Sequence, residues 1–346
     1  MSTQITLSRK QTIEQSTGQQ AALALAGLAA NKAAAGNAFD RYREDLADGS
    51  KRAQASDLQS FAEYLAAAGV RTSGERLYSE PAAWQGMSWG LVEGFVRWLL
   101  QRGDAISTLN RRLSTIKSHA KIAAQAGFIG EHELALIQIV KGKSGKAGKR
   151  VDAKREVTRL STKKSEAVQI TPEQAEQLKA QPDTPQGRRD ALLMALLLDH
   201  GMRAGEVALL KVGNFDLPAG MVRFYRPKVD NIGNHKLTAD TLRAVQNWQV
   251  SGDCPAMGEV LRGSIKGGAL AEQGMSERAI TERVRVLGEQ IGLSGLSAHD
   301  CRHYAATDMA GKGYNLKELM DWFGWASPAT AMRYVESTKV QERYKG

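Results

Sequence analysis

Residues 322–335 read Trp-Phe-Gly-Trp-Ala-Ser-Pro-Ala-Thr-Ala-Met-Arg-Tyr-Val. The Ser-Pro pair in this stretch is typical of a helix start, because proline fits the first helical turn. Tyr334 then lies about two turns into the predicted helix. A single tyrosine in such a place is normally half-buried packing. The interpretation of Tyr334 therefore depends on the polar residues that precede it.

Two earlier segments carry polar groups that helix packing does not require. Residues 297–303 read Ser-Ala-His-Asp-Cys-Arg-His. On a helix, His299 and Arg302 would share a face and could converge on one anion. Residues 201–210 begin Gly-Met-Arg-Ala-Gly-Glu and place Arg203 where the chain turns after an apolar helix. Each pattern alone is weak, since an isolated arginine there is most simply paired with the glutamate three residues on.

A short hairpin is predicted within residues 215–238. Strand residues from Met221 to Tyr225 are followed by the turn sequence Lys-Val-Asp-Asn-Ile-Gly and by a returning strand from His235 to Thr238. This places Lys228 at or near the turn. Lysines in hairpin turns are usually only solvated, so this position alone does not indicate a function.

The order of these groups is more informative than any one of them. An arginine, a hairpin lysine, His-x-x-Arg, Gly-Trp and a tyrosine nine residues later follow one another along the chain. This order resembles that of the tyrosine recombinase, or phage integrase, family, which includes the Cre and Xer recombinases. The resemblance covers about residues 40–340 and is most specific in the last fifty residues.

The resemblance implies a catalytic role for each of these groups. Two arginines would hold the phosphate, the hairpin lysine would act as general acid, the histidine would lie beside the phosphate and the tyrosine would attack it. A glutamate behind them would orient its neighbours. The residues so implied are Arg203, Lys228, His299, Arg302, Trp325 and Tyr334, with Glu206 as the supporting acid.

Two positions leave the assignment open. Many family members have histidine where this chain has Trp325, and an indole N–H can donate a hydrogen bond but cannot shuttle a proton. Lys236 on the returning strand could compete with Lys228 for the role of general acid.

Elementary chemistry supports this set of groups. An unperturbed phenol has a pKa of about 10, so neighbouring cations and a base must help remove its proton. Two guanidinium groups can hold both non-bridging phosphate oxygens. A lysine can protonate the departing 5′ oxygen. Such a site needs no metal or other cofactor, and a phosphotyrosine bond keeps the energy for resealing without ATP.

The expected fold class is mainly α in two domains. The resemblance implies a helical SAM-like core-binding domain plus an α+β catalytic domain with a small antiparallel sheet, the tyrosine recombinase catalytic fold. Residues 1–36 are interpreted as an N-terminal extension and 37–140 as the helical domain. Residues 141–168 are a basic linker and 169–346 the catalytic domain, which is expected to be helical after its hairpin.

DNA contacts are expected from one helix face and from the linker. Along residues 107–121 an apolar stripe lies opposite a polar face with no acid, which favours a surface laid against phosphates over an ordinary solvated face. The linker is rich in glycine and lysine, but its spacing excludes a phosphate-binding loop. The expected DNA-binding residues are Asn110, Arg111, Ser114, Lys117, Lys121, Lys141, Lys143, Lys146, Lys149 and Arg150.

Composition bounds the partners and the compartment. The formal charge of +10 suits a polyanion, although many enzymes are mildly basic. The two cysteines, Cys254 and Cys301, form no Cys-x-x-Cys pair, so neither a zinc site nor a disulfide framework is implied. The N-terminus lacks a signal-peptide pattern, and the apolar run over 21–30 is too short to span a bilayer. A cytoplasmic protein without membrane contact is expected.

The implied partner is double-stranded DNA with a specific target site. The resemblance implies a homo-tetramer on paired sites and a monomer or dimer free in solution. A type IB topoisomerase shares the tyrosine, arginines and lysine, and a non-catalytic DNA-binding protein could keep the fold, so both remain alternatives. The sequence leaves open the target sequence and the choice among integration, excision, resolution and inversion.

Overall fold

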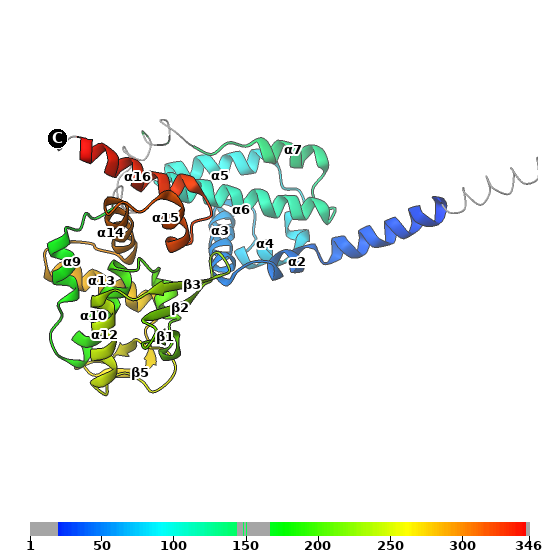
Figure 1. Cartoon of the computed structure of the whole chain (residues 1–346). Coiled ribbons are helices and arrows are strands. Elements are labelled where there is room, and N and C mark those ends of the chain that lie inside the picture. The colour runs from blue at the N-terminus through cyan, green and yellow to red at the C-terminus, as the bar shows by residue number, and fades with distance from the viewer. Residues whose placement is uncertain (1–19, 144–147, 149, 151–166, 344–346) are drawn as a thin grey trace, which may run out of the picture. The chain divides into compact units, whose positions relative to one another are not determined.

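The computed structural model describes residues 20–143, 148, 150 and 167–343. The chain divides into two compact units, Met1–Thr162 and Lys163–Gly346 (Figure 1). This division falls between the helical domain and the catalytic domain expected from the sequence. The proposed bounds of those domains, and of the extension and linker beside them, stay predictions.

The described part of the first unit is helical. A largely exposed helix over residues 20–36 leads into the bundle, while residues 1–19 lie outside the described range. The aromatic residues Phe61, Trp84 and Phe95 are fully buried at the centre of the bundle. The bundle elements are α2 (Ala38–Glu44), α3 (Asp48–Ala67), α4 (Gly74–Ser79), η1 (Pro81–Trp84), α5 (Trp89–Gln101), α6 (Ile106–Gln125) and α7 (Glu131–Ile139).

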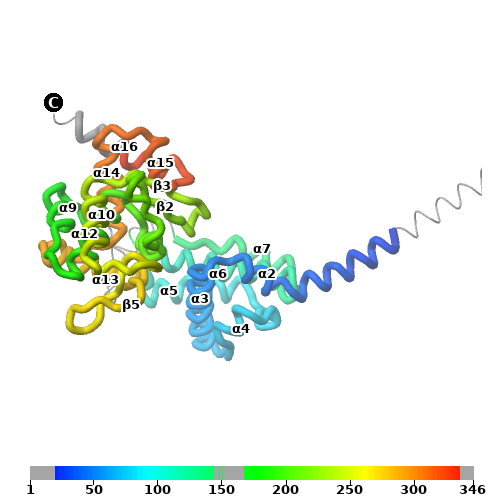
Figure 2. The backbone as a smooth tube through the Cα atoms, turned by 60° about the horizontal axis from the view of Figure 1, so that its bottom comes forward, coloured from blue at the N-terminus to red at the C-terminus, as the bar shows by residue number. Residues whose placement is uncertain are grey.

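The second unit is built around one buried helix. α10 (Pro185–Leu198) is capped by Thr184, whose hydroxyl accepts a hydrogen bond from the Gly187 N–H, and its residues 192–198 are all buried. It contacts α9, α12 and α14, which surround it in Figure 2. The other helices are α9 (Pro172–Lys179), α11 (Ala204–Ala208), η2 (Val212–Asn214), α12 (Ala239–Val250), α13 (Glu277–Gln290), α14 (Ala298–Gly311), α15 (Leu316–Phe323) and α16 (Pro328–Arg343).

A three-stranded antiparallel sheet lies in this unit, with the strand order β1-β2-β3. The strands are β1 (Phe215–Asp216), β2 (Met221–Arg226) and β3 (Asn231–Lys236). Along β2, Val222, Phe224 and Arg226 are buried while the residues between them are exposed, which is the period of two expected for a strand with one buried face. The last inward position of β2 therefore carries a charge.

Two details of the sequence-based prediction are wrong. The hairpin turn spans residues 227–230, so β3 begins at Asn231 and not at His235, and Thr238 caps α12 and is not a strand residue. Asp230 closes the turn with a φ of 45°. The chain after this hairpin is also not wholly helical, because β4 (Arg262–Ser264) and β5 (Leu270–Gly274) form a second hairpin. That pair is short and contains few β-branched residues, so it gave no strand pattern.

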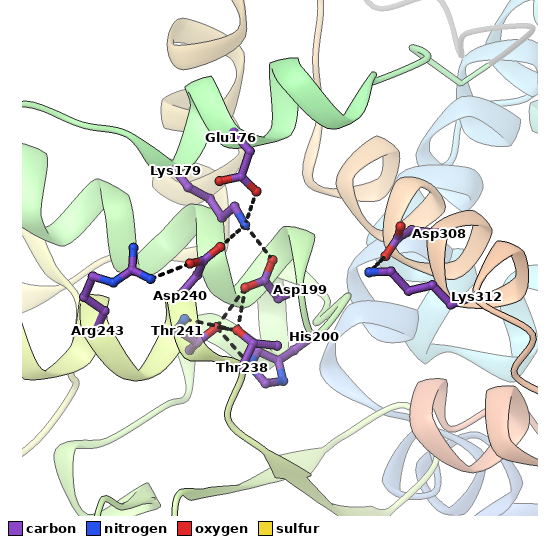
Figure 3. A network of polar contacts seen from close by, with 10 residues as sticks. All are labelled: Glu176, Lys179, Asp199, His200, Thr238, Asp240, Thr241, Arg243, Asp308 and Lys312. Carbon is purple, nitrogen blue, oxygen red and sulfur yellow. Dashed lines mark hydrogen bonds and ion pairs between the residues drawn. The ribbon is translucent and has the colours of Figure 1, made fainter.

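Lys179 is the centre of a polar network that joins α9 to the start of α12 (Figure 3). Its ammonium group lies 2.5 Å from Asp240, 3.2 Å from Asp199 and 2.8 Å from Glu176. The Thr238 hydroxyl donates to Asp199 at 2.6 Å. The Lys179 side chain is only 12% exposed, and of its partners Asp199 and Asp240 are partly buried whereas Glu176 is exposed.

Replacing Lys179 with methionine is expected to destabilise the second unit by about 1–3 kcal/mol, because two partly buried carboxylates would lose their shared cation. At this size that corresponds to a fall in melting temperature of roughly 3–10 °C. Lys312→Met is the matched control, since Lys312 pairs with Asp308 on an exposed helix face and should contribute less than about 0.5 kcal/mol. Equal melting temperatures for the two variants would contradict the prediction.

Candidate active site

The last three helices bring polar groups of the C-terminal segment together. α14, α15 and α16 contact one another and enclose a small core of their own around Phe323 (Figure 1). α15 ends at Gly324, which adopts the left-handed conformation with a φ of 60°. The Trp325 N–H then donates to the Met320 carbonyl at 2.9 Å. This tight helix end directs the chain from Trp325 into α16, which carries Tyr334.

Arg302 lies on the buried side of α14. Its Nη1 donates to the Gly201 carbonyl at 2.6 Å and its Nη2 to the Phe323 carbonyl at 2.5 Å. The side chain is 6% exposed. Burial, and then the nearby charge of Arg203, lower the pKa of Arg302 to about 9, so it keeps its charge at neutral pH. Each terminal nitrogen retains a second N–H that can bind an anion.

Arg203 is held by Glu206 at the start of α11. The Glu206 carboxylate accepts one hydrogen bond from the Arg203 backbone N–H at 2.9 Å and another from its guanidinium at 2.5 Å. Glu206 is buried and Arg203 is about one quarter exposed. The pairing expected as an ordinary helix-end contact is therefore present, and it also fixes the guanidinium in an accessible position.

Tyr334 packs between two rings. Its ring stacks on Trp325 at a centroid distance of 5.2 Å and an interplanar angle of 4°, and it meets His303 edge-on at 5.0 Å. The Arg302 guanidinium lies 5.7 Å from the Trp325 ring. Burial raises the pKa of Tyr334 above its usual value, while the charges of Arg302 and Arg333 act to lower it. The phenol is thus protonated at neutral pH but lies in a cationic environment.

Lys228 lies in the exposed turn between β2 and β3. With Arg203, Glu206 and Glu277 it lines a pocket of about 480 Å³. Lys236 is also exposed, but it lies at the far end of β3, where it pairs with Met221. The pocket therefore associates Lys228, and not Lys236, with the Arg203–Glu206 pair.

His299 and Arg302 lie in different surroundings, and the expected role of His299 stays a prediction. Both lie on α14, but His299 is exposed while Arg302 is buried among backbone carbonyls. The ring in contact with Tyr334 is that of His303, one residue beyond Arg302. Sequence analysis quoted His303 in the segment but assigned it no role, and helical spacing offered a signal, because residues 299 and 303 lie one turn apart.

A second residue missed by sequence analysis is Arg226. It is 3% exposed and donates to the carbonyls of Asp321 and Trp322 at 3.3 and 2.5 Å. Its signal in the sequence was the alternation of β2, since it follows the inward positions Val222 and Phe224 at intervals of two.

Three of the five residues expected to bind DNA on α6 have intramolecular side-chain partners. Arg111 donates to Asp57 of α3 at 2.6 Å, so an acid does face this polar surface. The Asn110 amide donates to the Lys143 carbonyl at 2.6 Å, and Lys117 donates to the Val140 carbonyl at 2.5 Å. Ser114 and Lys121 are exposed.

The expected linker contacts fall only partly within the described residues. Lys141 is exposed, Lys143 is half-buried and Arg150 is exposed, whereas Lys146 and Lys149 lie outside the described residues. The assignment of this surface to DNA stays a prediction.

Across residues 20–143 and 167–343, no group of three histidine, cysteine, aspartate or glutamate side chains could hold a metal ion. Within the described part of the chain, no helix has the length and apolar character needed to cross a bilayer.

The second unit is thus mainly helical, with the buried Arg302 beside the stacked Trp325 and Tyr334 rings. The chain belongs to the phage integrase family: the family model described as "Phage integrase family" matches residues 169–341, half of the sequence. The family resemblance and the mainly α fold with small antiparallel sheets, both expected from the sequence, are confirmed.

Curated relatives extend the similarity over most of the chain. It is 27% identical to tyrosine recombinase XerC of Roseiflexus castenholzii over 308 residues, which cover 86% of this chain and 87% of that protein. It is 26% identical to tyrosine recombinase XerC of Herpetosiphon aurantiacus over 327 residues, covering 91% and 90%.

Solved structures share the fold at lower identity. The Tn1549 transposon integrase in complex with transposon right end DNA matches with a TM-score of 0.58 and 15% identity, over 89% of this chain and 98% of that chain. A lambda integrase tetramer bound to a Holliday junction matches with a TM-score of 0.51 and 14% identity, over 72% and 64%.

Proposed function

We propose that this chain is a site-specific DNA recombinase that cuts and rejoins strands through a 3′-phosphotyrosyl link at Tyr334. The observation that carries the proposal is the position of Tyr334, stacked on Trp325 within a cluster that holds the charged Arg302. Membership of the phage integrase family and similarity to two XerC recombinases over most of their length support it.

In the proposed cleavage step the Tyr334 oxygen forms a bond to phosphorus as the bond from phosphorus to the 5′ oxygen breaks. The phenol passes its proton to the imidazole of His303, whose ring contacts Tyr334, and Lys228 gives a proton to the departing oxygen. The reverse step, with a 5′ hydroxyl from another strand as nucleophile, rejoins the DNA. The reaction needs no ATP, because the energy of the diester bond is kept in the phosphotyrosine. It needs no metal, because the two arginines stabilise the charge on the phosphate.

Arg203 and Arg302 are proposed to bind the non-bridging oxygens. Both are pre-positioned, the first by Glu206 and the second by two backbone carbonyls. Donors fixed before the reaction are the most effective at stabilising charge that develops in the transition state. Trp325 stacks on the Tyr334 ring, and His303 lies against its edge. We propose that His303 and the exposed His299, which the family resemblance implied, both lie beside the phosphate.

The proposed partner is double-stranded DNA with a specific site, bound in the cytoplasm by a homo-tetramer on paired sites. The net charge of +10 suits a polyanionic partner. The structural neighbours include integrase bound to transposon DNA and an integrase tetramer on a Holliday junction, which supports both parts of this proposal.

A covalent-trapping experiment tests the function. A binding-site selection from random duplexes first supplies the target, and a nicked suicide duplex of that sequence then releases the short leaving strand after cleavage. The full chain should accumulate a denaturation-resistant protein–DNA adduct on its selected site and not on a scrambled one. Binding without any adduct would indicate a non-catalytic DNA-binding protein. Relaxation of plasmids that lack the site would indicate a topoisomerase.

A further inference from the structure

Two arginines bind the carbonyl end of α15. The last turn of a helix leaves carbonyl groups without intrahelical partners, and the helix dipole makes this end negative. Arg302 binds the Phe323 carbonyl, whereas Arg226 binds those of Asp321 and Trp322. Arg302 belongs to the site already described, but Arg226 comes from the sheet.

The surroundings of Arg226 are shaped to hold its guanidinium. A Cβ added to Gly324 would come within 2.3 Å of its Nη1, and one added to Gly233 within 2.8 Å of its Nε. The Nε2 atom of His235 lies 2.9 Å from Arg226 Nη2 and also 2.9 Å from the Trp322 carbonyl, so this ring packs between the guanidinium and the end of α15. Burial lowers the pKa of His235 to about 2, in agreement with a neutral ring. Two glycines and a histidine thus form a fitted compartment.

The backbone of Arg226 also closes the turn that carries Lys228. The Val229 N–H donates to the Arg226 carbonyl at 3.1 Å, which makes residues 226–229 a β-turn. Pro227 occupies the second position of this turn, where its fixed φ is favourable, and Lys228 occupies the third. Residues 227–230 are all exposed. Arg226 is therefore the last buried residue before the lysine.

We propose that Arg226 is a positioning residue that fixes the Lys228 turn against the end of α15 and so places the lysine for proton donation. The inference rests on the proposed function and adds a residue to it. Without Arg226 the end of α15 would still be fixed by two hydrogen bonds, from Arg302 to the Phe323 carbonyl and from the Trp325 N–H to the Met320 carbonyl. Loss of Arg226 should therefore affect the hairpin lysine more than the nucleophile.

A substrate with a sulfur leaving group separates a loss of proton donation from a loss of nucleophilic attack. A thiolate leaves without protonation because a thiol pKa is about 8.5, far below that of an alcohol. The experiment compares cleavage of two suicide duplexes, one with oxygen and one with sulfur at the bridging 5′ position. The proteins compared are the unchanged chain, Arg226→Met, Arg226→Lys and Lys228→Ala. Arg226→Met should cleave the oxygen substrate about 10²-fold more slowly, as expected for a displaced general acid. The sulfur substrate should restore its rate to within about threefold of the unchanged protein.

Lys228→Ala should show the same rescue, and Arg226→Lys an intermediate loss, since an ammonium cannot reproduce the planar fork of donors. Arg223→Met, a change of an exposed arginine on the same strand, should leave the ratio of sulfur to oxygen rates unchanged. The proposal would be overturned if Arg226→Met and Arg226→Lys each lost cleavage rate equally on the oxygen and sulfur substrates, and if these losses followed a lowered melting temperature. Arg226 would then have a purely structural role. If Arg226→Met does not fold, the ratio for Arg226→Lys decides alone.

Failure of the proposed function gives a different result. In that case the unchanged protein forms no adduct with either substrate, whereas failure of the positioning role leaves the unchanged protein active. Absence of sulfur rescue in Lys228→Ala would contradict the role of Lys228, and with it the proposal for Arg226.

Discussion

Tyr334→Phe is expected to abolish the covalent protein–DNA adduct, with a loss of more than about 10⁴-fold in the rate of its formation, because removal of a nucleophile leaves no atom to attack the phosphate. The fold should be retained. The ring would still stack on Trp325 and meet His303, and these contacts do not need the hydroxyl. The measurement is denaturing electrophoresis of the protein with a labelled suicide duplex.

Tyr304→Phe is the matched control for that variant. Tyr304 is a half-buried tyrosine of α14 that packs against the main core of the second unit. Its variant should form the adduct at the normal rate, and both variants should bind the duplex equally. An adduct that survives Tyr334→Phe, or disappears with Tyr304→Phe, would show that the nucleophile has been misassigned.

Arg302→Lys is expected to lower the cleavage rate by about 10³-fold while the affinity for DNA changes only a few-fold. The three N–H groups of an ammonium radiate from one atom, so they cannot reproduce the planar fork that reaches the Gly201 and Phe323 carbonyls and still leaves two N–H groups for a phosphate. Binding should persist because many phosphate contacts across a DNA-binding surface share the affinity. Lysine is the informative substitution, since alanine would also leave buried carbonyls without donors.

Cleavage and equilibrium binding of one labelled duplex measure both quantities for Arg302→Lys. Arg285→Lys serves as its control, because Arg285 is a half-exposed α13 residue paired with Glu282 and Glu289. A parallel loss of affinity and cleavage in Arg302→Lys would mean that Arg302 acts in binding and not in the chemical step.

The sequence predicted the class of fold and the segments of the site, because both depend on local order along the chain. Helix starts such as Ser327-Pro328 and the spacing from Trp325 to Tyr334 are visible without coordinates. The direction of each side chain was less accessible. Helical spacing allowed His299 and Arg302 to share a face, yet packing of α14 buries one and exposes the other.

Long-range partners were beyond the reach of pattern analysis. The polar face of α6 lacks acids in its own sequence, but α3 supplies Asp57 to Arg111 across the bundle. Arg226 was visible only as part of a hairpin, whereas its side chain binds carbonyls 95 and 96 residues further along the chain. Such pairs follow from tertiary packing, which no local period encodes.

The two carbonyls that bind the Arg302 guanidinium determine when this side chain loses its conformational entropy: on folding, and not on DNA binding. Ordering an arginine side chain costs up to about 2 kcal/mol of rotamer freedom. Here folding has already met that cost, because the guanidinium is immobilised in the free protein. A DNA phosphate would then bind to an arginine that is already ordered. The free energy of binding the duplex could instead contribute to bending the DNA or separating its strands.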